Sequence, residues 1–406
     1  MRVVKIPVKT VGKPKKRVSR GYYLLLLMSV IGLMLFQYFR PLPPPVISYN
    51  LPDIPAPKPV DLAWPATGQA SISAQGYSFT STNAKPTQIS TASIAKVITV
   101  LCVLQKHPLK IGQQGPVITM SDADVTRLDA EINRNGTHLD IVKGEKITQY
   151  QAMEAIMLPS ANNIADTLAV WSFGSLEQYR AYAQDFVRKN GMTHTVIGAD
   201  ASGYDVDTKS TTQDLAILAK LALANPVLMK IAGEQSATFE TAGTVYNHNR
   251  LVGDNVMIGI KTGLNDGNSG GFLYAARRGN TTLTGAILDA GTMSEALNSS
   301  KRLAESAFDE FEKVKYIKAG TTVGELKTPW GENIGIVTAK DLDVTRWKAE
   351  RIYAATESET HYVFGDNAMK TGMVHVRTDG DKADSETQTI KGLDGPDLLW
   401  RLTRLR

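Results

Sequence analysis

A serine followed three residues later by a lysine is the first feature of this sequence that could do chemistry. Ser93 and Lys96 lie in the stretch QISTASIAKVITVLCVL (88–104), which is apolar at most positions around them. A helix that is apolar nearly all round is expected to be buried, and within it these two side chains face the same way. Burial makes a neutral amine available as a base, and a base beside a hydroxyl gives a serine nucleophile. A capping serine followed by a lysine that reaches solvent is the alternative interpretation.

Two more polar motifs follow along the chain. The stretch MLPSANNIADTLAV places Ser160 and Asn162 in a predicted loop between two helices, where a hydroxyl can relay a proton and an amide can hold a carbonyl. The stretch GIKTG places Lys261 and Thr262 near a predicted strand end, and Gly263 allows close backbone approach there. A cation beside a hydroxyl suits a carboxylate. A second Lys-Thr-Gly, at 370–372, lies in a polar region, and we interpret it as coincidence.

These side chains need a scaffold, and from about residue 66 the pattern is mixed α and β. Strands at both ends around a helical middle predict an α+β sandwich, with one sheet and helices on its faces. The residues after about 315 change to short alternating runs separated by Gly, Asn and Asp, which predicts a small β domain. Helices are expected over 148–158, 163–173, 175–191, 211–226 and 294–314, and strands over 70–82, 255–263, 270–278 and 281–290.

The first 65 residues predict a membrane anchor and a linker. Residues 1–20 hold eight basic and no acidic side chains. Residues 21–39 carry no charge, and their length is close to the roughly 20 residues that span a bilayer. A cleaved signal peptide is the alternative, but no small-x-small cleavage site follows. Residues 40–65, rich in proline, favour an extended linker. The basic tail is expected in the cytoplasm, and everything after the anchor outside it.

Composition excludes several classes of partner. The net charge is +5, but the first forty residues contribute nine basic side chains, so the remainder of the chain is mildly acidic, which argues against nucleic acid. The single cysteine, Cys102, lies in the apolar run and is expected to be a core residue. The histidines are scattered without metal-ligand spacing, so we predict no metal and no cofactor.

The order and spacing of the three motifs indicate a family. The intervals from Ser93 to Ser160 and from Ser160 to Lys261 are 67 and 101 residues. In this order and spacing the motifs resemble those of the penicillin-recognising serine acyltransferases, and among them the D-alanyl-D-alanine carboxypeptidases of the low-molecular-mass penicillin-binding proteins. Further stretches that fit the family over about residues 66–390 are VKGEKITQYQAMEAIMLPSANNIADTLA, GMTHTVIGADASGYD, STTQDLAILAKLAL and NHNRLV.

The resemblance implies a fold and a division of the chain. It implies a β-lactamase/transpeptidase-like sandwich, in which an antiparallel sheet has helices on both faces, plus a helical subdomain. We expect the catalytic domain over 66–314 and a small β-rich C-terminal domain over 315–406. The implied partners are peptidoglycan pentapeptides ending in D-Ala-D-Ala, β-lactams as covalent inhibitors, and the membrane.

The resemblance also implies a role for each motif residue. Ser93 would attack the carbonyl between the two terminal D-alanines, with Lys96 as base and Ser160 helping to move the proton to the leaving amine. The roles of binding the substrate would fall on five further residues. Asn162 would hold the acyl-side amide, Lys261 and Thr262 would bind the terminal carboxylate, and Gly263 would allow the backbone to approach closely. The backbone N–H of Leu264, with that of Ser93, would bind the oxyanion. His248 stands where the family often has a basic residue and is expected near the carboxylate, with an ordinary loop histidine as the alternative. Ala161 stands where the family commonly has glycine.

Three alternatives share these motifs. A class A β-lactamase needs a glutamate for deacylation, and none occurs between Glu177 and Glu234. An endopeptidase that cuts peptide cross-links would use the same residues. A non-catalytic wall-binding or β-lactam-sensing protein would have no need of a buried lysine beside the serine.

Overall fold

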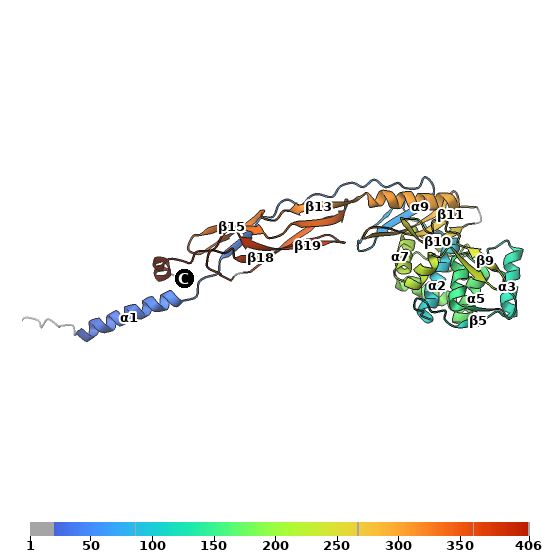
Figure 1. Cartoon of the computed structure of the whole chain (residues 1–406), viewed down its shortest axis with the longest axis horizontal. Coiled ribbons are helices and arrows are strands. Elements are labelled where there is room, and N and C mark those ends of the chain that lie inside the picture. Colours follow the sequence, from blue (N-terminus) through green and yellow to red (C-terminus); the bar gives the residue numbers. More distant parts are fainter. Residues whose placement is uncertain (1–19, 86, 266–267, 360, 405–406) are drawn as a thin grey trace, which may run out of the picture.

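The computed structural model describes residues 20–85, 87–265, 268–359 and 361–404. The molecule is elongated (Figure 1). The helix α1 (Arg20–Phe39) lies at one end, a part built of strands follows it, and a part of mixed helices and strands lies at the other end. The C-terminal end of the chain returns to the neighbourhood of α1.

A five-stranded antiparallel sheet forms the centre of the mixed part. Its strand order is β10-β11-β12-β2-β3, so the N-terminal pair of strands is added to the edge of a meander formed later in the chain. The strands are β2 (Gln69–Ala74), β3 (Thr80–Thr82), β10 (Met257–Leu264), β11 (Gly270–Arg278) and β12 (Thr281–Ala290).

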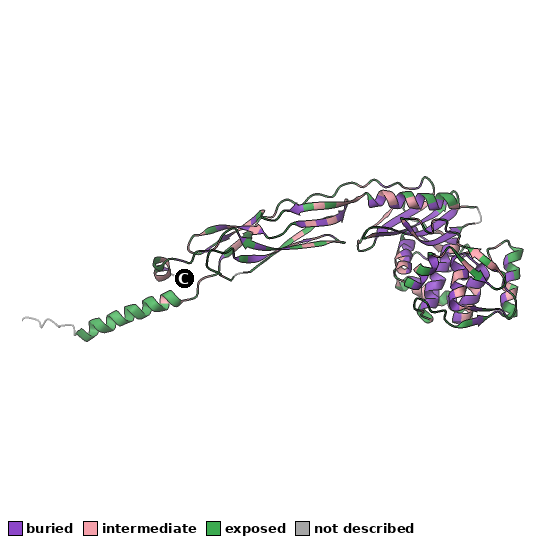
Figure 2. Ribbon diagram, in the orientation of Figure 1, coloured by how far each residue is buried: buried purple, intermediate pink, exposed green. Residues whose placement is uncertain are grey.

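Helices cover both faces of this sheet because its central strands are apolar on both sides. In β11, Phe272 and Tyr274 pack into one core, while Leu273 and Ala275, which alternate with them, pack into another. The covering helices are α9 (Met293–Phe308) on the first face, and α7 (Thr212–Leu223) and α2 (Ala95–Lys106) on the second. The predicted sandwich is therefore confirmed, and Figure 2 shows its buried interior.

A group of helices forms the predicted helical subdomain beside the sheet. Their first turns have local caps: the Thr148 hydroxyl accepts from the backbone N–H of Gln151, and Asn225 caps a helix that starts with Pro226. The helices are α3 (Asp122–Asn133), α4 (Gln149–Met157), α5 (Asn162–Phe173), α6 (Leu176–Lys189) and α8 (Pro226–Ala232). Short strand pairs connect them, namely β4 (Ile89–Ser90) with β7 (Lys209–Ser210), β5 (Val117–Thr119) with β6 (Lys146–Thr148), and β8 (Ser236–Phe239) with β9 (Gly243–Tyr246).

The last predicted helix of the mixed part is shorter than expected. The amphipathic pattern over 294–314 predicts one helix, but α9 ends at Phe308 and a strand begins at Phe311. The ring of Phe311 packs edge-on against Trp347, with 5.1 Å between ring centroids. Pairing of Phe311 with Trp347 in a two-stranded ladder thus overrides a weak local helical pattern.

The strand-rich part has its own apolar core. A six-stranded sheet has the order β1-β14-β15-β19-β18-β17, and β13 pairs with β16. The core is formed by residues such as Val323, Ile336 and Val374. The strands are β1 (Val46–Tyr49), β13 (Phe311–Ile317), β14 (Thr322–Lys327), β15 (Asn333–Thr338), β16 (Leu342–Trp347), β17 (Tyr353–Ser358), β18 (Lys370–Arg377) and β19 (Lys382–Thr389).

The proline-rich segment differs from the extended linker expected over residues 40–65. Residues 46–49, which contain no proline, pair as strand β1 with β14. Further on, the fully buried Arg346 guanidinium donates to the carbonyls of Pro55 and Ala56, both at 2.9 Å. Proline composition alone does not reveal this packing. The backbone of residues 46–49 is satisfied by the edge of β14, and the carbonyls of Pro55 and Ala56 are satisfied by the donors of Arg346.

The helix α1 is long and apolar enough to cross a membrane, and no part of it is buried (Figure 2). The short helix α10 (Leu398–Thr403) lies beside its end. The Arg404 guanidinium donates to the carbonyls of Gln37 and Pro41, both at 3.2 Å, which satisfies acceptors at the end of α1. Trp400 packs on Trp330 of the strand-rich part, so the terminal helix contacts both elements.

Replacement of Arg346 by methionine tests whether the proline-rich segment is fixed to the sheet. The variant loses the donors to Pro55 and Ala56 and an ion pair with Glu312, which lies 2.9 Å away. We expect the free energy of unfolding to fall by about 1–3 kcal/mol, and proteolytic cleavage within residues 50–64 to become faster. The control is Lys58→Met, which removes the exposed second partner of Glu312 and should cost less than about 1 kcal/mol. Equal cleavage of the two variants would contradict the prediction.

Candidate active site

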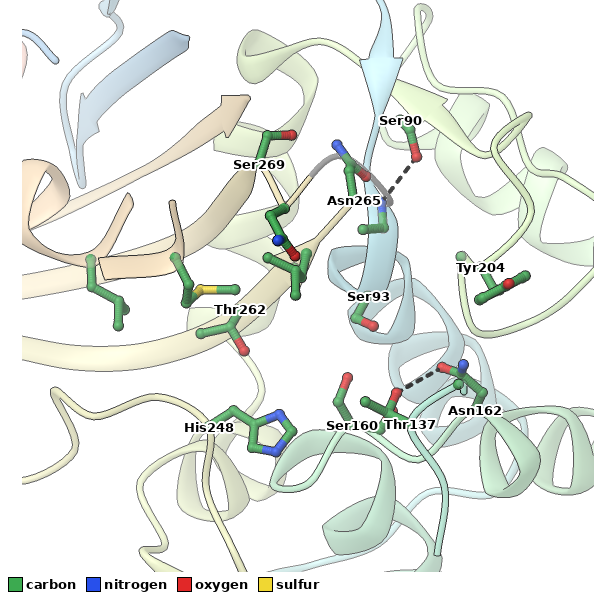
Figure 3. A pocket seen from close by; sticks show the side chains of 18 of the residues that line it. Ser90, Ser93, Thr137, Ser160, Asn162, Tyr204, His248, Thr262, Asn265 and Ser269 are labelled. Atoms are coloured by element: carbon green, nitrogen blue, oxygen red, sulfur yellow. Dashed lines mark hydrogen bonds between the residues drawn. The ribbon is translucent and has the colours of Figure 1, made fainter. Parts of the chain in front are cut away.

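A cleft of about 950 Å³ lies where the edge strand β10 meets the start of α2 and the helical subdomain. Figure 3 shows side chains from these segments directed into it, among them Ser93, Ser160, Thr262 and His248. Five non-glycine residues have a positive φ in the described ranges, and every one of them lines the cleft: Ala92, Asn135, Ser160, Asn268 and Asp289. Strained backbone of this kind collects at functional sites.

Ser93 lies on a single 3₁₀ turn, Ala92–Ile94, immediately before α2. The prediction of one helix through 88–104 is therefore wrong at its start, where the chain forms the short strand β4 and then this turn. The preceding residue, Ala92, has φ +44°, and its carbonyl approaches Gly203 so closely that a Cβ there would lie 2.2 Å from the oxygen. Ser93 is half-buried and faces the cleft.

Lys96 is fully buried one turn further along, and its amine touches three groups. Its Nζ lies 2.8 Å from Ser93 Oγ, 2.7 Å from Asn162 Oδ1 and 2.9 Å from the Ser202 carbonyl. Two of these partners are oxygens that can only accept. A neutral amine has two N–H groups, which Asn162 and Ser202 accept, so its lone pair is left for the hydroxyl proton of Ser93.

Burial also adjusts the protonation of this amine. Desolvation lowers the pKa of Lys96 to about 7, although three carboxylates in the neighbourhood act to raise it. A substantial fraction of neutral amine is therefore present near neutral pH. This pKa suits a general base better than the ordinary value for lysine.

Ser160 and Asn162 face the same space from the loop between α4 and α5. Ser160 has φ +68° and is 3% exposed, and its Oγ has no hydrogen-bond partner among the described residues. Its carbonyl accepts from the Thr137 hydroxyl at 2.8 Å, which holds the loop. The same hydroxyl lies 3.3 Å from Asn162 Oδ1 (Figure 3). Asn162, the first residue of α5, accepts from Lys96 and donates through Nδ2 to Glu131 Oε2 at 3.0 Å.

Lys261 and Thr262 are neighbours on β10, where Thr262 lines the cleft and Lys261 is buried beside it without being one of the lining residues. The Lys261 ammonium is 1% exposed and has no hydrogen-bond partner within the described ranges, and desolvation together with Lys96 holds its pKa well below the ordinary value. The Thr262 hydroxyl faces the cleft (Figure 3). Gly263 lies so close to the 3₁₀ turn that bears Ser93 that a Cβ would come within 2.9 Å of the Thr91 carbonyl. Leu264 follows it and is 52% exposed at the cleft wall.

His248 lies on the cleft side of the loop that follows β9, between Ser160 and Thr262 in Figure 3. Its backbone N–H donates to the Leu158 carbonyl at 3.1 Å. Desolvation and the neighbouring cation of Lys261 lower the pKa of His248 to about 4. The imidazole is therefore neutral near pH 7. It can form a hydrogen bond, but it carries no positive charge of the kind that a basic residue at this position would supply.

The structure thus brings together the side chains of all three motifs. Ala161, where the family commonly has glycine, is buried in the helical core and does not line the cleft. Three further residues at the site were not predicted from the sequence: Glu131 contacts Asn162, Thr137 contacts the Ser160 loop, and the Ser202 carbonyl contacts Lys96. A hint was present in α3, where Asp124, Leu128 and Glu131 recur at helical spacing on the buried side. In the described parts of the chain, no group of three His, Cys, Asp or Glu side chains is placed to hold a metal ion.

The fold and the site define a serine acyltransferase of the penicillin-recognising class. The family model for D-alanyl-D-alanine carboxypeptidases matches residues 75–292, and the chain belongs to this family.

Individual proteins resemble the chain to different extents. D-alanyl-D-alanine carboxypeptidase DacC of Escherichia coli is 27% identical over 276 residues, which is 65% of this chain and 67% of that protein. Penicillin-binding protein 5 of Haemophilus influenzae shares the fold over 83% of this chain and 99% of its own, with a TM-score of 0.58 and 18% identity. The Streptomyces K15 DD-transpeptidase matches 63% of this chain and all of its own, with a TM-score of 0.54 and 20% identity.

The geometry at Lys96 predicts a pH dependence. If the neutral amine accepts the Ser93 proton, acylation is slow below the pKa of Lys96 and rises through about pH 7 to a plateau. The measurement is the second-order rate of labelling by a fluorescent penicillin from about pH 5 to about pH 9. Lys96→Arg, which stays protonated throughout, should lower the plateau about 10²–10⁴-fold. A pH-independent rate would refute the assignment of Lys96 as base.

Proposed function

We propose that the chain is a membrane-anchored serine-type D-alanyl-D-alanine carboxypeptidase, which removes the terminal D-alanine from peptidoglycan stem peptides through an acyl-enzyme on Ser93. One observation supports this above the others. Ser93 Oγ lies 2.8 Å from a buried amine whose two other partners are both acceptors. That arrangement turns the lysine lone pair toward the serine proton, as acylation requires.

In the proposed acylation step, Ser93 Oγ attacks the carbonyl carbon of the penultimate D-alanine, and its proton passes to Lys96 Nζ. The tetrahedral oxyanion then collapses and the C–N bond breaks. The proton moves from Lys96 to the leaving amine through the Ser160 hydroxyl, which is buried and has no partner among the described residues. The oxyanion would be stabilised by the backbone N–H groups of Ser93 and Leu264, which both line the cleft.

Deacylation would use the same groups in reverse. A water molecule gives a proton to the neutral Lys96 as it attacks the ester, and the proton returns to Ser93 Oγ when the ester bond breaks. The shortened peptide then leaves. This hydrolysis would need no separate glutamate base, which agrees with the absence of glutamate between Glu177 and Glu234.

Substrate binding would divide between two sides of the cleft. On one side, the Asn162 amide would donate to the carbonyl of the acyl-side peptide. On the other, the C-terminal carboxylate of the substrate would be bound by Lys261 and Thr262, with Gly263 keeping this strand close to the nucleophile. The substrate carboxylate would also act as a counter-ion for the buried Lys261, and so raise the pKa of this lysine. The neutral imidazole of His248 would add a hydrogen bond to that carboxylate.

We also propose how the chain is placed in the cell. The basic residues 1–20 would lie in the cytoplasm, α1 would span the membrane, and residues 66–314 would act as the catalytic domain outside it. The β-rich residues 315–406, with the strand β1 of the proline-rich segment, would form the spacer between the two. The β-lactams would act as covalent inhibitors because they imitate D-Ala-D-Ala.

Incubation of the full-length protein in detergent with a muropeptide pentapeptide tests the proposed activity. Mass spectrometry should show the loss of one alanine, and Ser93→Ala should abolish both this loss and labelling by fluorescent penicillin. The control is Ser300→Ala, which removes a buried hydroxyl from α9, away from the cleft.

Two outcomes would point to other functions. An intact pentapeptide together with cleavage of a cross-linked dimer would identify an endopeptidase. An intact pentapeptide and an intact dimer, with Ser93 still labelled by penicillin, would identify a sensor.

A further inference from the structure

The orientation of one side-chain amide decides which way the Lys96 lone pair points. Asn162 presents Oδ1 to Lys96 Nζ at 2.7 Å and Nδ2 to Glu131 Oε2 at 3.0 Å. If the amide turned over, its NH₂ group would face the amine and its oxygen would face a carboxylate. Two donors would then meet on one side and two acceptors on the other. Glu131 and Lys96 therefore favour the observed orientation, to which the Thr137 hydroxyl adds a longer hydrogen bond to Oδ1 at 3.3 Å.

The Glu131 carboxylate is buried beside Asn162, in a space that the loop of Gly136 leaves for it. It lies on α3 and is only 2% exposed. The backbone leaves room for its carboxylate only because residue 136 is glycine: a Cβ on Gly136 would lie 2.0 Å from Glu131 Oε2. The backbone N–H of Gly136 also donates to the Glu131 carbonyl at 2.8 Å, which fixes the loop around the carboxylate.

Arg134 holds the carboxylate from the other side. Its Nε donates to Glu131 Oε2 at 3.0 Å, and its Nη2 pairs with Oε1. The guanidinium lies over the ring of Tyr204, with 3.7 Å from its carbon to the ring centroid. A bidentate pair of this kind fixes direction as well as charge.

The contacts close into a ring around the amine. The backbone N–H of Tyr204 donates to the Ser202 hydroxyl at 3.1 Å, and the Ser202 carbonyl accepts from Lys96 at 2.9 Å. From Lys96 the ring therefore runs through Asn162, Glu131, Arg134 and the loop of Ser202 and Tyr204 back to Lys96. Both acceptors of the amine belong to this ring.

We propose that Glu131 is a positioning residue for the acylation: it holds Asn162 so that Oδ1 accepts from Lys96 while the second N–H of Nδ2 is free for the acyl-side carbonyl of the substrate. Arg134 keeps the Glu131 carboxylate in place. This inference rests on the proposed function of the same site. It adds a residue on α3, outside the three sequence motifs, to the groups that determine the rate.

Several charged groups surround Lys96 besides Glu131. Asp166 on α5 and Asp200 in the loop after α6 act to raise the pKa of Lys96, as Glu131 does, and Arg134 acts to lower it. Lys261 on β10 is a further neighbouring cation. Loss of the Glu131 charge alone should therefore lower the pKa of Lys96 further, which a purely structural defect would not do.

The test is Glu131→Gln in the full-length protein, with acylation by fluorescent penicillin as the probe. The glutamine amide can donate or accept, so Asn162 is no longer fixed. We expect the plateau rate to fall about tenfold, the effect of one lost hydrogen bond to a charged group. We also expect the acidic limb of the pH profile to move to lower pH. Gly136→Ala, which displaces the carboxylate without removing it, should lower the plateau rate too.

Asp124→Asn is the matched control. Asp124 also lies on the buried side of α3, pairs with an arginine three residues later, and accepts from Thr167 on α5 at 2.7 Å. It therefore ties the same two helices together without touching Asn162. We expect its melting temperature to fall, with the plateau rate per labelled site and the acidic limb unchanged.

Titration of Lys96 by NMR, with lysine labelled at Cε, gives a readout that needs no reaction. A Glu131→Gln variant with the wild-type acylation rate, or with an unshifted Lys96 titration, would overturn the proposal. Rate losses that match those of Asp124→Asn would also overturn it. Failure of the wild type to react with penicillin would instead overturn the proposed function, and the NMR titration would still decide the role of Glu131.

Discussion

The proposed chemistry depends on one buried amine that has two acceptors and, among the described residues, no carboxylate as a direct partner. Lys96 is completely covered, and within the described ranges its Nζ contacts an amide oxygen, a backbone carbonyl and a serine hydroxyl, but no carboxylate. Desolvation of the ammonium therefore dominates, and the pKa of Lys96 falls to about 7. A direct ion pair would have kept the lysine protonated and the serine inert.

The fold serves to bring three separate segments to this amine at fixed distances. The turn that bears Ser93 packs on β10, where Gly263 permits the approach, and on the loop of Gly203, where glycine again leaves the necessary space. The loop that bears Ser160 joins α4 to α5 and is held by Thr137. Strained backbone at Ala92 and Ser160 persists because the packed sheet and helices on each side over-determine it.

Much of the fold and of the candidate site could be predicted from the sequence, and the physical reason differs from one element to the next. The strands β11 and β12 match their predicted bounds because each has an apolar centre rich in strand-forming residues and the two are joined by a short turn. The motif residues could be placed because their spacing along the chain resembles that of a known family. The 3₁₀ turn at Ser93 and the strand at 46–49 could not, since each depends on a partner distant in sequence, Gly203 in one case and β14 in the other. Glu131 was missed because an acidic residue on a short polar helix is usually exposed, and only the packing of α3 on α5 shows that it is buried.

The three carboxylates near Lys96 raise the question of why they leave its pKa low. Each has other donors. Asp200 accepts from the backbone N–H groups of Ser202, Gly203 and Asp205, and Glu131 is paired with Arg134. Asp166 accepts from the backbone N–H of Ala201, and burial raises its pKa to about 6. Their charge is thus largely balanced by groups other than the lysine. The same carboxylates hold the loop and the amide that receive the lysine N–H groups, so in the proposed mechanism they would orient Lys96 without keeping it protonated.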